Sequence, residues 1–265
     1  MEEHPVPMNS LALTLDTISS NTPCTIPKSW LQGRTAYGGL SAAMALQLAM
    51  KEHSTDLPPL RTAQISFIGP VTESVCFRTE VLRRGKSVTQ IGVDGHVADA
   101  LAVRASFCFA AERQSTIHHM RAQRPDVGPP SDYDESIAWA NPPGFFQNFD
   151  VRFVGESLPD SSSTVPELLA WVRLRDADDI RPEVALMATG DSLPPAAMAM
   201  FAGPTPISSM NWTIDLVGPA GTPGWLLLRS RSLAASNGYS FQLMEIWDVH
   251  GNLVMLSTQT VAIFG

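Results

Sequence analysis

The clearest feature of the hydrophobic pattern is a run of apolar and small residues over positions 38–50. It opens with Gly38 and Gly39, and after them only Ser41 and Gln47 are polar. A helix that is apolar nearly all round lies inside a protein, whereas a surface helix carries a single apolar stripe. About a dozen residues is too few to cross a bilayer, which takes about 20. The pattern therefore predicts a buried helix that other elements enclose.

Segments with strand character surround this helix. A short leading strand is expected within residues 9–24, where Leu11 and Leu13 alternate with other residues. After the helix come four strand-like segments separated by short polar turns, at 60–68, 75–82, 87–97 and 100–110. Consecutive strands joined by short turns pair as an antiparallel sheet. We therefore expect one helix followed by a sheet that is long enough to wrap it.

The second half of the chain repeats this order. Residues 182–202 have helical character with an expected break at Gly190 and Pro194, and strands are expected at 145–154, 169–175, 209–217, 225–234, 239–249 and 253–263. The dipeptide Gly-Pro ends the strand after each helix, at positions 69–70 and again about 150 residues later at 218–219. Repeats in solenoid proteins are about 20–50 residues long. The longer period therefore indicates a duplicated domain.

The duplication predicts an α+β fold, in which two tandem curved antiparallel sheets each wrap a central apolar helix. This is a double hotdog. We expect an N-terminal hotdog over 1–112, a proline-rich linker over 113–144 and a C-terminal hotdog over 145–265. The two copies can pair through sheet edges or faces, as the subunits of a homodimer would.

Composition and charge exclude several classes of protein. The formal net charge of −8 and the isoelectric point near 5.2 argue against nucleic-acid binding and against a basic membrane surface. The three cysteines, Cys24, Cys76 and Cys108, are too few and too widely spaced for a disulfide framework or a metal site. The first residues are acidic and lack an apolar run, so neither a secretory signal nor a membrane span is expected, and the cytoplasm is the default location.

Several segments of both halves resemble the acyl-CoA thioesterase II family. They are Ala36-Tyr37-Gly38-Gly39, Trp171-Val172-Arg173-Leu174 with Asp178-Asp179, Ser209-Met210-Asn211-Trp212, and the stretch from Trp225-Leu226-Leu227-Leu228 through Glu245-Ile246-Trp247-Asp248 to Gly251 and Gln259. The resemblance covers nearly the whole chain. It implies hydrolysis of acyl-CoA by a water molecule, without a covalent nucleophile. It also implies no cofactor, since CoA enters as part of the substrate.

In that family the water is held by an aspartate, a threonine and a glutamine of the second hotdog. The family glutamine falls on Gln259, the aspartate on Asn211 and the threonine on Leu233. An amide can orient a water but is no base near neutral pH, and leucine can do neither. Two carboxylates could compensate. Asp215 lies four residues after Asn211, on the same face of a strand, and Asp191 is expected at the start of a helical segment, where the helix dipole stabilises a carboxylate.

Simpler interpretations of these carboxylates stay open, since Asp191 could be a plain helix cap and Asp215 an exposed charge. Candidates for substrate binding are Gly38, Gly39, Leu233 and the basic turn of Arg83, Arg84 and Lys86. The glycines leave backbone N–H groups uncovered that could hold a carbonyl oxygen or an anion, or they could only let helix and sheet pack closely. The basic turn could contact CoA phosphates or be solvated, as could Arg229 and Arg231.

These observations predict an acyl-CoA thioesterase of lipid metabolism with an apolar acyl pocket between helix and sheet. Its partner is then acyl-CoA, with no nucleic acid and no membrane, and a homo-oligomer is left open. Loss of two family residues makes a non-catalytic acyl-CoA or lipid-binding module the alternative. A hotdog dehydratase or isomerase ranks last, because no histidine stands at a helix start.

Overall fold

The computed structural model describes residues 11–134, 139 and 141–264. Its helices are α1 (Leu11–Thr17), α2 (Gly38–Glu52) and α3 (Pro182–Gly190), and its 3-10 segments are η1 (Lys28–Trp30), η2 (Pro130–Asp132), η3 (Gly144–Asn148) and η4 (Ala196–Met200). The strands of the first half are β1 (Pro23–Thr25), β2 (Leu31–Gln32), β3 (Thr35–Ala36), β4 (Leu60–Phe67), β5 (Ser74–Arg84), β6 (Val88–Val97) and β7 (Ala100–Ala110). Those of the second half are β8 (Phe149–Phe153), β9 (Glu167–Leu174), β10 (Ile207–Leu216), β11 (Leu226–Ser236), β12 (Tyr239–Asp248) and β13 (Leu253–Ile263).

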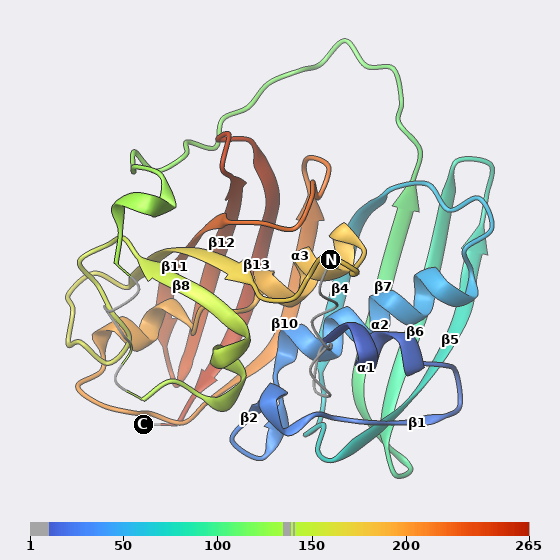
Figure 1. The fold of residues 1–265 in the computed structure, drawn as a ribbon, viewed down its shortest axis with the longest axis horizontal. Helices are drawn as coiled ribbons and strands as arrows, with labels where there is room; N and C mark the ends of the chain where they lie inside the picture. The colour runs from blue at the N-terminus through green and yellow to red at the C-terminus, as the bar shows by residue number, and fades with distance from the viewer. Residues whose placement is uncertain (1–10, 135–138, 140, 265) are drawn as a thin grey trace, which may run out of the picture.

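The two predicted sheets form one continuous antiparallel sheet (Figure 1). Its eleven strands run in the order β1-β5-β6-β7-β4-β10-β13-β12-β11-β9-β8. The halves join where β4 pairs with β10, with Ile65 opposite Trp212. The predicted double hotdog is therefore confirmed, and its copies meet edge to edge.

The central helices α2 and α3 lie on the same side of the sheet and contact each other (Figure 1). As the pattern over 38–50 predicts, α2 is buried along most of its length. Strand residues that face the helices are apolar and buried, including Ile65, Phe107 and Trp212. One hydrophobic core thus extends through both halves.

Strand bulges support the duplication independently of sequence. β4 and β10 are each interrupted near the start, at positions 61 and 210. β5 and β11 are each interrupted near the end, at positions 82 and 233. A bulge inserts one extra residue and changes which residues face which side, so equivalent bulges about 150 residues apart indicate two copies of one design.

Two expectations about local structure are wrong. The leading segment forms α1 and only the three-residue strand β1, because Leu11, Thr14 and Leu15 share one buried helical face; positions 9 and 10 lie outside the described residues. The helical region after residue 182 does break after Gly190 as expected, but η4 begins only at Ala196. Asp191 consequently follows the last residue of α3 and does not begin a helix.

The segment after β7 crosses between the halves and then covers the outer face of the second one (Figure 1). Ala122, Val127 and Tyr133 pack on a second apolar cluster that contains Trp171 and Trp247. The indole N–H of Trp171 donates a hydrogen bond to the backbone oxygen of Gly128 at 3.1 Å. This segment therefore anchors the connection between the halves to the C-terminal one.

Candidate active site

A cavity of about 860 Å³ opens where the start of α2 and the end of α3 meet strands β10 and β13. Both halves contribute to its wall, and most of its lining is apolar, including Phe67, Phe145, Leu193 and Met198. Among the described residues that line it, Asp191 is the one charged group. A site of this size with few polar groups is typical of small-molecule binding.

Asp191 is held by groups from both halves of the chain. The side-chain N–H of Gln259, on β13, donates to its Oδ1 at 2.5 Å. The backbone N–H of Gly39, in the first turn of α2, also donates to the carboxylate. A Cβ at Gly38 would lie 2.7 Å from Oδ2, so only glycine lets the helix start approach this closely. The backbone N–H of Gly39 is therefore used by the side chain of Asp191 in this structure.

The environment of Asp191 changes its acidity. Burial raises the pKa of this carboxyl from 3.8 to about 7, and the hydrogen bonds from Gln259 and Gly39 offset part of the rise. The Tyr37 hydroxyl next to it donates to the backbone oxygen of Ala188 at 3.0 Å. Burial, and then the charge of Asp191, raise the pKa of the Tyr37 phenol, which stays protonated. A carboxyl with a pKa near neutrality can accept and return a proton at physiological pH.

Gln259 belongs to a buried chain of amides. Its Oε1 accepts hydrogen bonds from Nε2 of Gln242 at 3.1 Å and from Oγ of Ser209 at 3.3 Å. Only 1% of the surface of Gln259 is exposed. An unpaired amide in such a place would cost about 1–3 kcal/mol. Its oxygen and one of its N–H groups therefore fix the orientation of the amide, and its second N–H is left for another partner.

Gln242 continues the chain to the backbone. Its Oε1 accepts the backbone N–H of Ala196 at 3.1 Å and the hydroxyl of Ser230 at 3.4 Å. Ala196 is the first residue of η4, directly after Pro195. The amide chain therefore connects η4 to Asp191.

The structure does not bring the other predicted catalytic residues to this site. Asn211 and Asp215 share one face of β10, as expected, but both are exposed and neither lines the cavity. The bulge at Met210 is the reason, because it places Ser209 opposite buried Val261 and turns Asn211 to the outer face. There Oδ1 of Asn211 accepts the backbone N–H of Thr260 at 3.1 Å.

Of the predicted substrate-binding residues, the two glycines lie at the cavity or at Asp191, and the others lie away from it. Gly38 lines the cavity and Gly39 contacts Asp191. Leu233 stands at the bulge of β11, is 54% exposed and does not line the cavity. Arg83, Arg84 and Lys86 are exposed around the β5–β6 turn and do not line the cavity.

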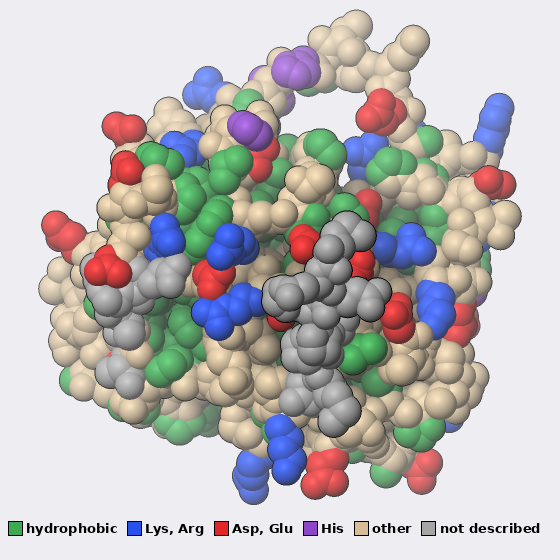
Figure 2. All heavy atoms as spheres, in the orientation of Figure 1, with side chains coloured by type: hydrophobic (Ala, Val, Ile, Leu, Met, Phe, Trp, Pro, Cys, Tyr) green, Lys and Arg blue, Asp and Glu red, His purple; other side chains and the backbone are tan. Residues whose placement is uncertain are grey.

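Arg229 and Arg231 are also away from the cavity. Arg229 forms an ion pair with Glu167 at 2.8 Å, and Arg231 forms one with Glu245 at 3.4 Å. On the face drawn in Figure 2, basic and acidic side chains are interspersed. The charge of these two arginines is therefore balanced locally.

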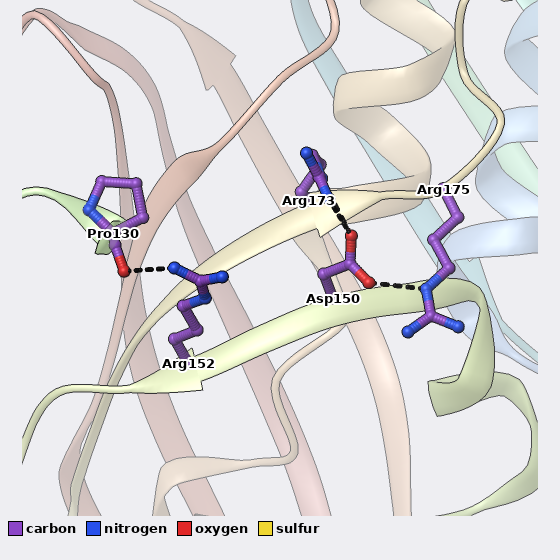
Figure 3. A network of polar contacts seen from close by, with 5 residues as sticks. All are labelled: Pro130, Asp150, Arg152, Arg173 and Arg175. Carbon is purple, nitrogen blue, oxygen red and sulfur yellow. Dashed lines mark hydrogen bonds and ion pairs between the residues drawn. The ribbon is translucent and has the colours of Figure 1, made fainter. Parts of the chain in front are cut away.

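A second cavity, of about 480 Å³, adjoins the first, since Trp139 and Pro143 line both. Its wall includes Asp150 and Arg175. Asp150 accepts from Arg173 at 2.5 Å and from Arg175 at 2.6 Å (Figure 3). Burial acts to raise the pKa of Asp150, but these two partners hold it below its usual value. The terminal nitrogens of Arg175 point away from Asp150 in Figure 3, so they can donate to another group.

Sequence reasoning missed Ser209, Gln242 and Tyr37. Gln242 lies on a face of β12 that alternation could have identified, because its neighbours Ser240, Met244 and Ile246 are also buried. The orientation of Ser209 depends on a bulge and has no local signal.

Among residues 11–134, 139 and 141–264, no group of three or more His, Cys, Asp or Glu is arranged to hold a metal ion. No helix within that part of the chain is long and apolar enough to cross a membrane.

Solved structures with this fold include three that match the chain over nearly its whole length. A conserved protein of unknown function with a hot dog fold from Alicyclobacillus acidocaldarius is 24% identical, with a TM-score of 0.82 and 92% of each chain covered. A putative thioesterase II from Thermobifida fusca is 21% identical, with a TM-score of 0.82 and coverage of 98% of this chain and 99% of that one. The acyl-CoA thioesterase II TesB2 from Mycobacterium marinum is 19% identical, with a TM-score of 0.71 and coverage of 91% and 92%. These likenesses support the hotdog fold.

Comparison of the chain with domain families gives a more specific result than the solved structures do. None of the curated proteins matches the chain in sequence. The acyl-CoA thioesterase N-terminal domain matches residues 26–110, and the acyl-CoA thioesterase C-terminal domain matches residues 121–263. Together these matches include α2, α3, Asp191 and Gln259, and the chain therefore belongs to the acyl-CoA thioesterase family.

Proposed function

We propose that the protein hydrolyses the thioester of an acyl-CoA at Asp191 and Gln259. Membership of the acyl-CoA thioesterase family supports thioester hydrolysis in general. The observation that carries the specific proposal is the hydrogen bond between Gln259 and a carboxyl with a pKa of about 7, at the wall of a largely apolar cavity. Such a carboxyl is matched to a proton transfer at neutral pH.

In the proposed reaction, Asp191 takes a proton from a water molecule as the water oxygen attacks the thioester carbon. Gln259 has two N–H groups, of which one is given to Asp191. The second can donate to the water or to the oxygen that gains negative charge. When the tetrahedral intermediate breaks its carbon–sulfur bond, Asp191 returns the proton to the leaving thiolate. The products are a carboxylic acid and CoA.

The two cavities suit the two ends of such a substrate. The apolar wall of the larger one fits an acyl chain. In the adjoining cavity, Arg175 offers donors to an anionic group and Trp139 offers an aromatic ring. We place the phosphates of CoA there, in preference to the basic turn of the first half. The cytoplasmic location and the role in lipid metabolism stay predictions from the sequence.

The test is release of free thiol from acyl-CoAs of short to long chain by the purified protein. Asp191→Asn should lower kcat/KM by about 100- to 10,000-fold, which is the range for loss of a general base. Asp99→Asn, at an exposed turn between β6 and β7, is the matched control and should keep full activity. Loss of activity in Asn211→Ala but not in Asp191→Asn would move the site to the outer face of β10.

The alternative is an acyl-CoA or lipid-binding protein without catalysis. It is favoured by the absence from the cavity of the positions predicted to match the family aspartate and threonine, Asn211 and Leu233. Calorimetry with a non-hydrolysable acyl-CoA analogue distinguishes the two functions. Tight binding without any thiol release supports the alternative, and release of thiol excludes it.

A further inference from the structure

We infer that Gln242, which does not line the cavity, is a positioning residue that determines which way the amide of Gln259 faces Asp191. Gln242 is 1% exposed and is absent from the described lining of the cavity. It lies directly opposite Gln259 in the pairing of β12 with β13. Its connection to Asp191 runs through Gln259, and its other main contact, with the backbone N–H of Ala196, anchors η4.

The direction of the amide chain follows from its backbone end. The N–H of Ala196 can only donate, so the group of Gln242 that faces it must be the oxygen. The NH₂ group of Gln242 is then left to donate to Gln259, whose own oxygen must face it. The NH₂ group of Gln259 therefore faces the carboxylate of Asp191.

The two hydroxyls along the chain are compatible with this direction. Ser230 donates to the oxygen of Gln242 and Ser209 donates to the oxygen of Gln259. A hydroxyl can donate or accept, so neither serine sets the direction. The backbone N–H of Ala196 alone sets the direction, because it can donate a hydrogen bond but cannot accept one.

The direction matters because both ends of an amide fit the same space. If Gln259 were turned over, its oxygen would face the carboxylate of Asp191. That contact is repulsive when Asp191 is ionised and becomes a hydrogen bond when Asp191 is protonated. Gln242 thus favours the ionised form of Asp191, which is the form that can accept a proton from water.

Among the described residues that line the cavity, no other charged group competes for control of Asp191. From α2 it meets the N–H of Gly39, and beside it stands the phenol of Tyr37, which donates elsewhere. From β13 it meets Gln259. The remaining described residues that line the cavity carry no charge. A change in the orientation of Gln259 should therefore appear directly in the titration of Asp191.

The decisive variant is Gln242→Glu, which keeps the size of the side chain. The new carboxylate still accepts from Ala196 and Ser230 but has no N–H for Gln259, so Gln259 should turn over. We expect the acidic limb of the pH profile of kcat/KM to move up by about one pH unit, which lowers activity about tenfold below the limb. Activity should recover at higher pH, whereas a merely misfolded site would not recover. Gln90→Glu, at an exposed position of β6, controls for the change in total charge. The repulsion between a charge at position 242 and Asp191 is controlled for by the neutral variant at the same position.

A neutral variant and a second measurement keep the test independent of folding and of catalysis. Gln242→Met has a similar size and no amide, so it releases the orientation of Gln259 and should shift the limb in the same direction by a smaller amount. The carboxyl of Asp191 can also be titrated directly by infrared spectroscopy of protein with ¹³C-labelled aspartate, with Asp191→Asn to identify its band. Both variants should raise the pKa of that band.

The inference rests on the proposed function only for the kinetic measurement. If the native protein releases no thiol but both variants shift the titration of Asp191, the proposed function fails and the positioning role stands. If the native protein hydrolyses acyl-CoA and neither variant moves the pH profile or the carboxyl band, the positioning role of Gln242 is wrong.

Discussion

The two halves of the molecule share one design but use their central helices differently. In the first half α2 runs for 15 residues without interruption, and in the second half α3 ends after nine. Both helices are buried against the sheet and contact each other. Helix α2 packs against the sheet and leaves the backbone N–H groups of its first turn available. Helix α3 ends early, and the carboxylate of Asp191 follows its last residue.

Close packing requires glycine at the last residue of the second helix. A Cβ at Gly190 would meet the end of Met255 and would lie 3.1 Å from the Trp212 ring. Pro194 and Pro195 then prevent the chain from returning directly to a helix. The chain turns at Asp191, and the carboxylate meets the first turn of α2. The site therefore needs both copies, one as a donor of backbone N–H groups and the other as the source of the acid.

After removal of the Asp191 carboxyl itself, the largest effect on this pairing should come from Gly38→Ala. The new Cβ would lie 2.7 Å from Oδ2 of Asp191 and 3.2 Å from the ring of Phe67, so the carboxylate must move. We expect kcat/KM for acyl-CoA to fall by about 30-fold, in line with the sensitivity of catalysis to small misplacements. Gly203→Ala is the control, because nothing lies within 4 Å of its Cβ. Full activity in Gly38→Ala would mean that the approach of the two helices is unimportant for catalysis.

A smaller effect concerns stability and pH. Because folding raises the pKa of Asp191 from 3.8 to about 7, the folded protein holds this proton more tightly than the unfolded chain does. The resulting stability is complete below pH 4 and is lost as the pH rises through 7. Asp191→Asn has no such loss. Because the side chain is only half-buried, we expect the variant to gain about 1–2 kcal/mol relative to the native protein between pH 5 and pH 8.5.

The measurement is urea unfolding of both proteins at the two pH values. A difference in unfolding free energy that does not change with pH would show that Asp191 is ionised in the folded protein at pH 5. Such a result would remove the physical basis for general-base catalysis, even if the geometry of the site is correct.

The smallest expected effect compares cationic groups of the two halves. Arg175→Gln, at the cavity of the second half, should raise KM for acyl-CoA about fivefold and leave kcat unchanged, as loss of one charge-assisted contact would. With a truncated acyl thioester that has no phosphate, the same variant should behave like the native protein. Arg84→Gln, in the first half, tests the basic turn, where this side chain already donates to the backbone of Thr55 at 2.9 Å. A larger rise in KM for Arg84→Gln would place the phosphates at the first half.

Much of this architecture could be predicted because its signals are local. The apolar run over 38–50, the strand alternation and the Gly-Pro repeats each reflect a period of the chain itself. The same reasoning placed α1 in a strand, since seven residues with Leu11 and Leu13 in alternation are too few to separate the two periods. It also named Asp191 and Gln259 as candidates, though not as partners.

The site could be predicted only in part, because bulges reverse the faces of strands. Ser209 and Asn211 would share a face in a regular strand, and the extra residue Met210 sends them to opposite sides. The bulge in β11 exposes Leu233 in the same way. Neither bulge involves glycine or proline, so the sequence gives no local indication of either bulge.

The sequence by itself determined two buried helices, two sets of strands and their duplication, because periodicity and turn residues act over a few neighbouring positions. Only the tertiary structure decided that the end of α3 meets the start of α2, and that Gln242 lies between η4 and Gln259. Those contacts join residues that are distant in the chain, and they depend on register and on close packing at Gly38 and Gly190. The acidity of Asp191 is a property of that assembled environment, since burial and donors from both halves set it together.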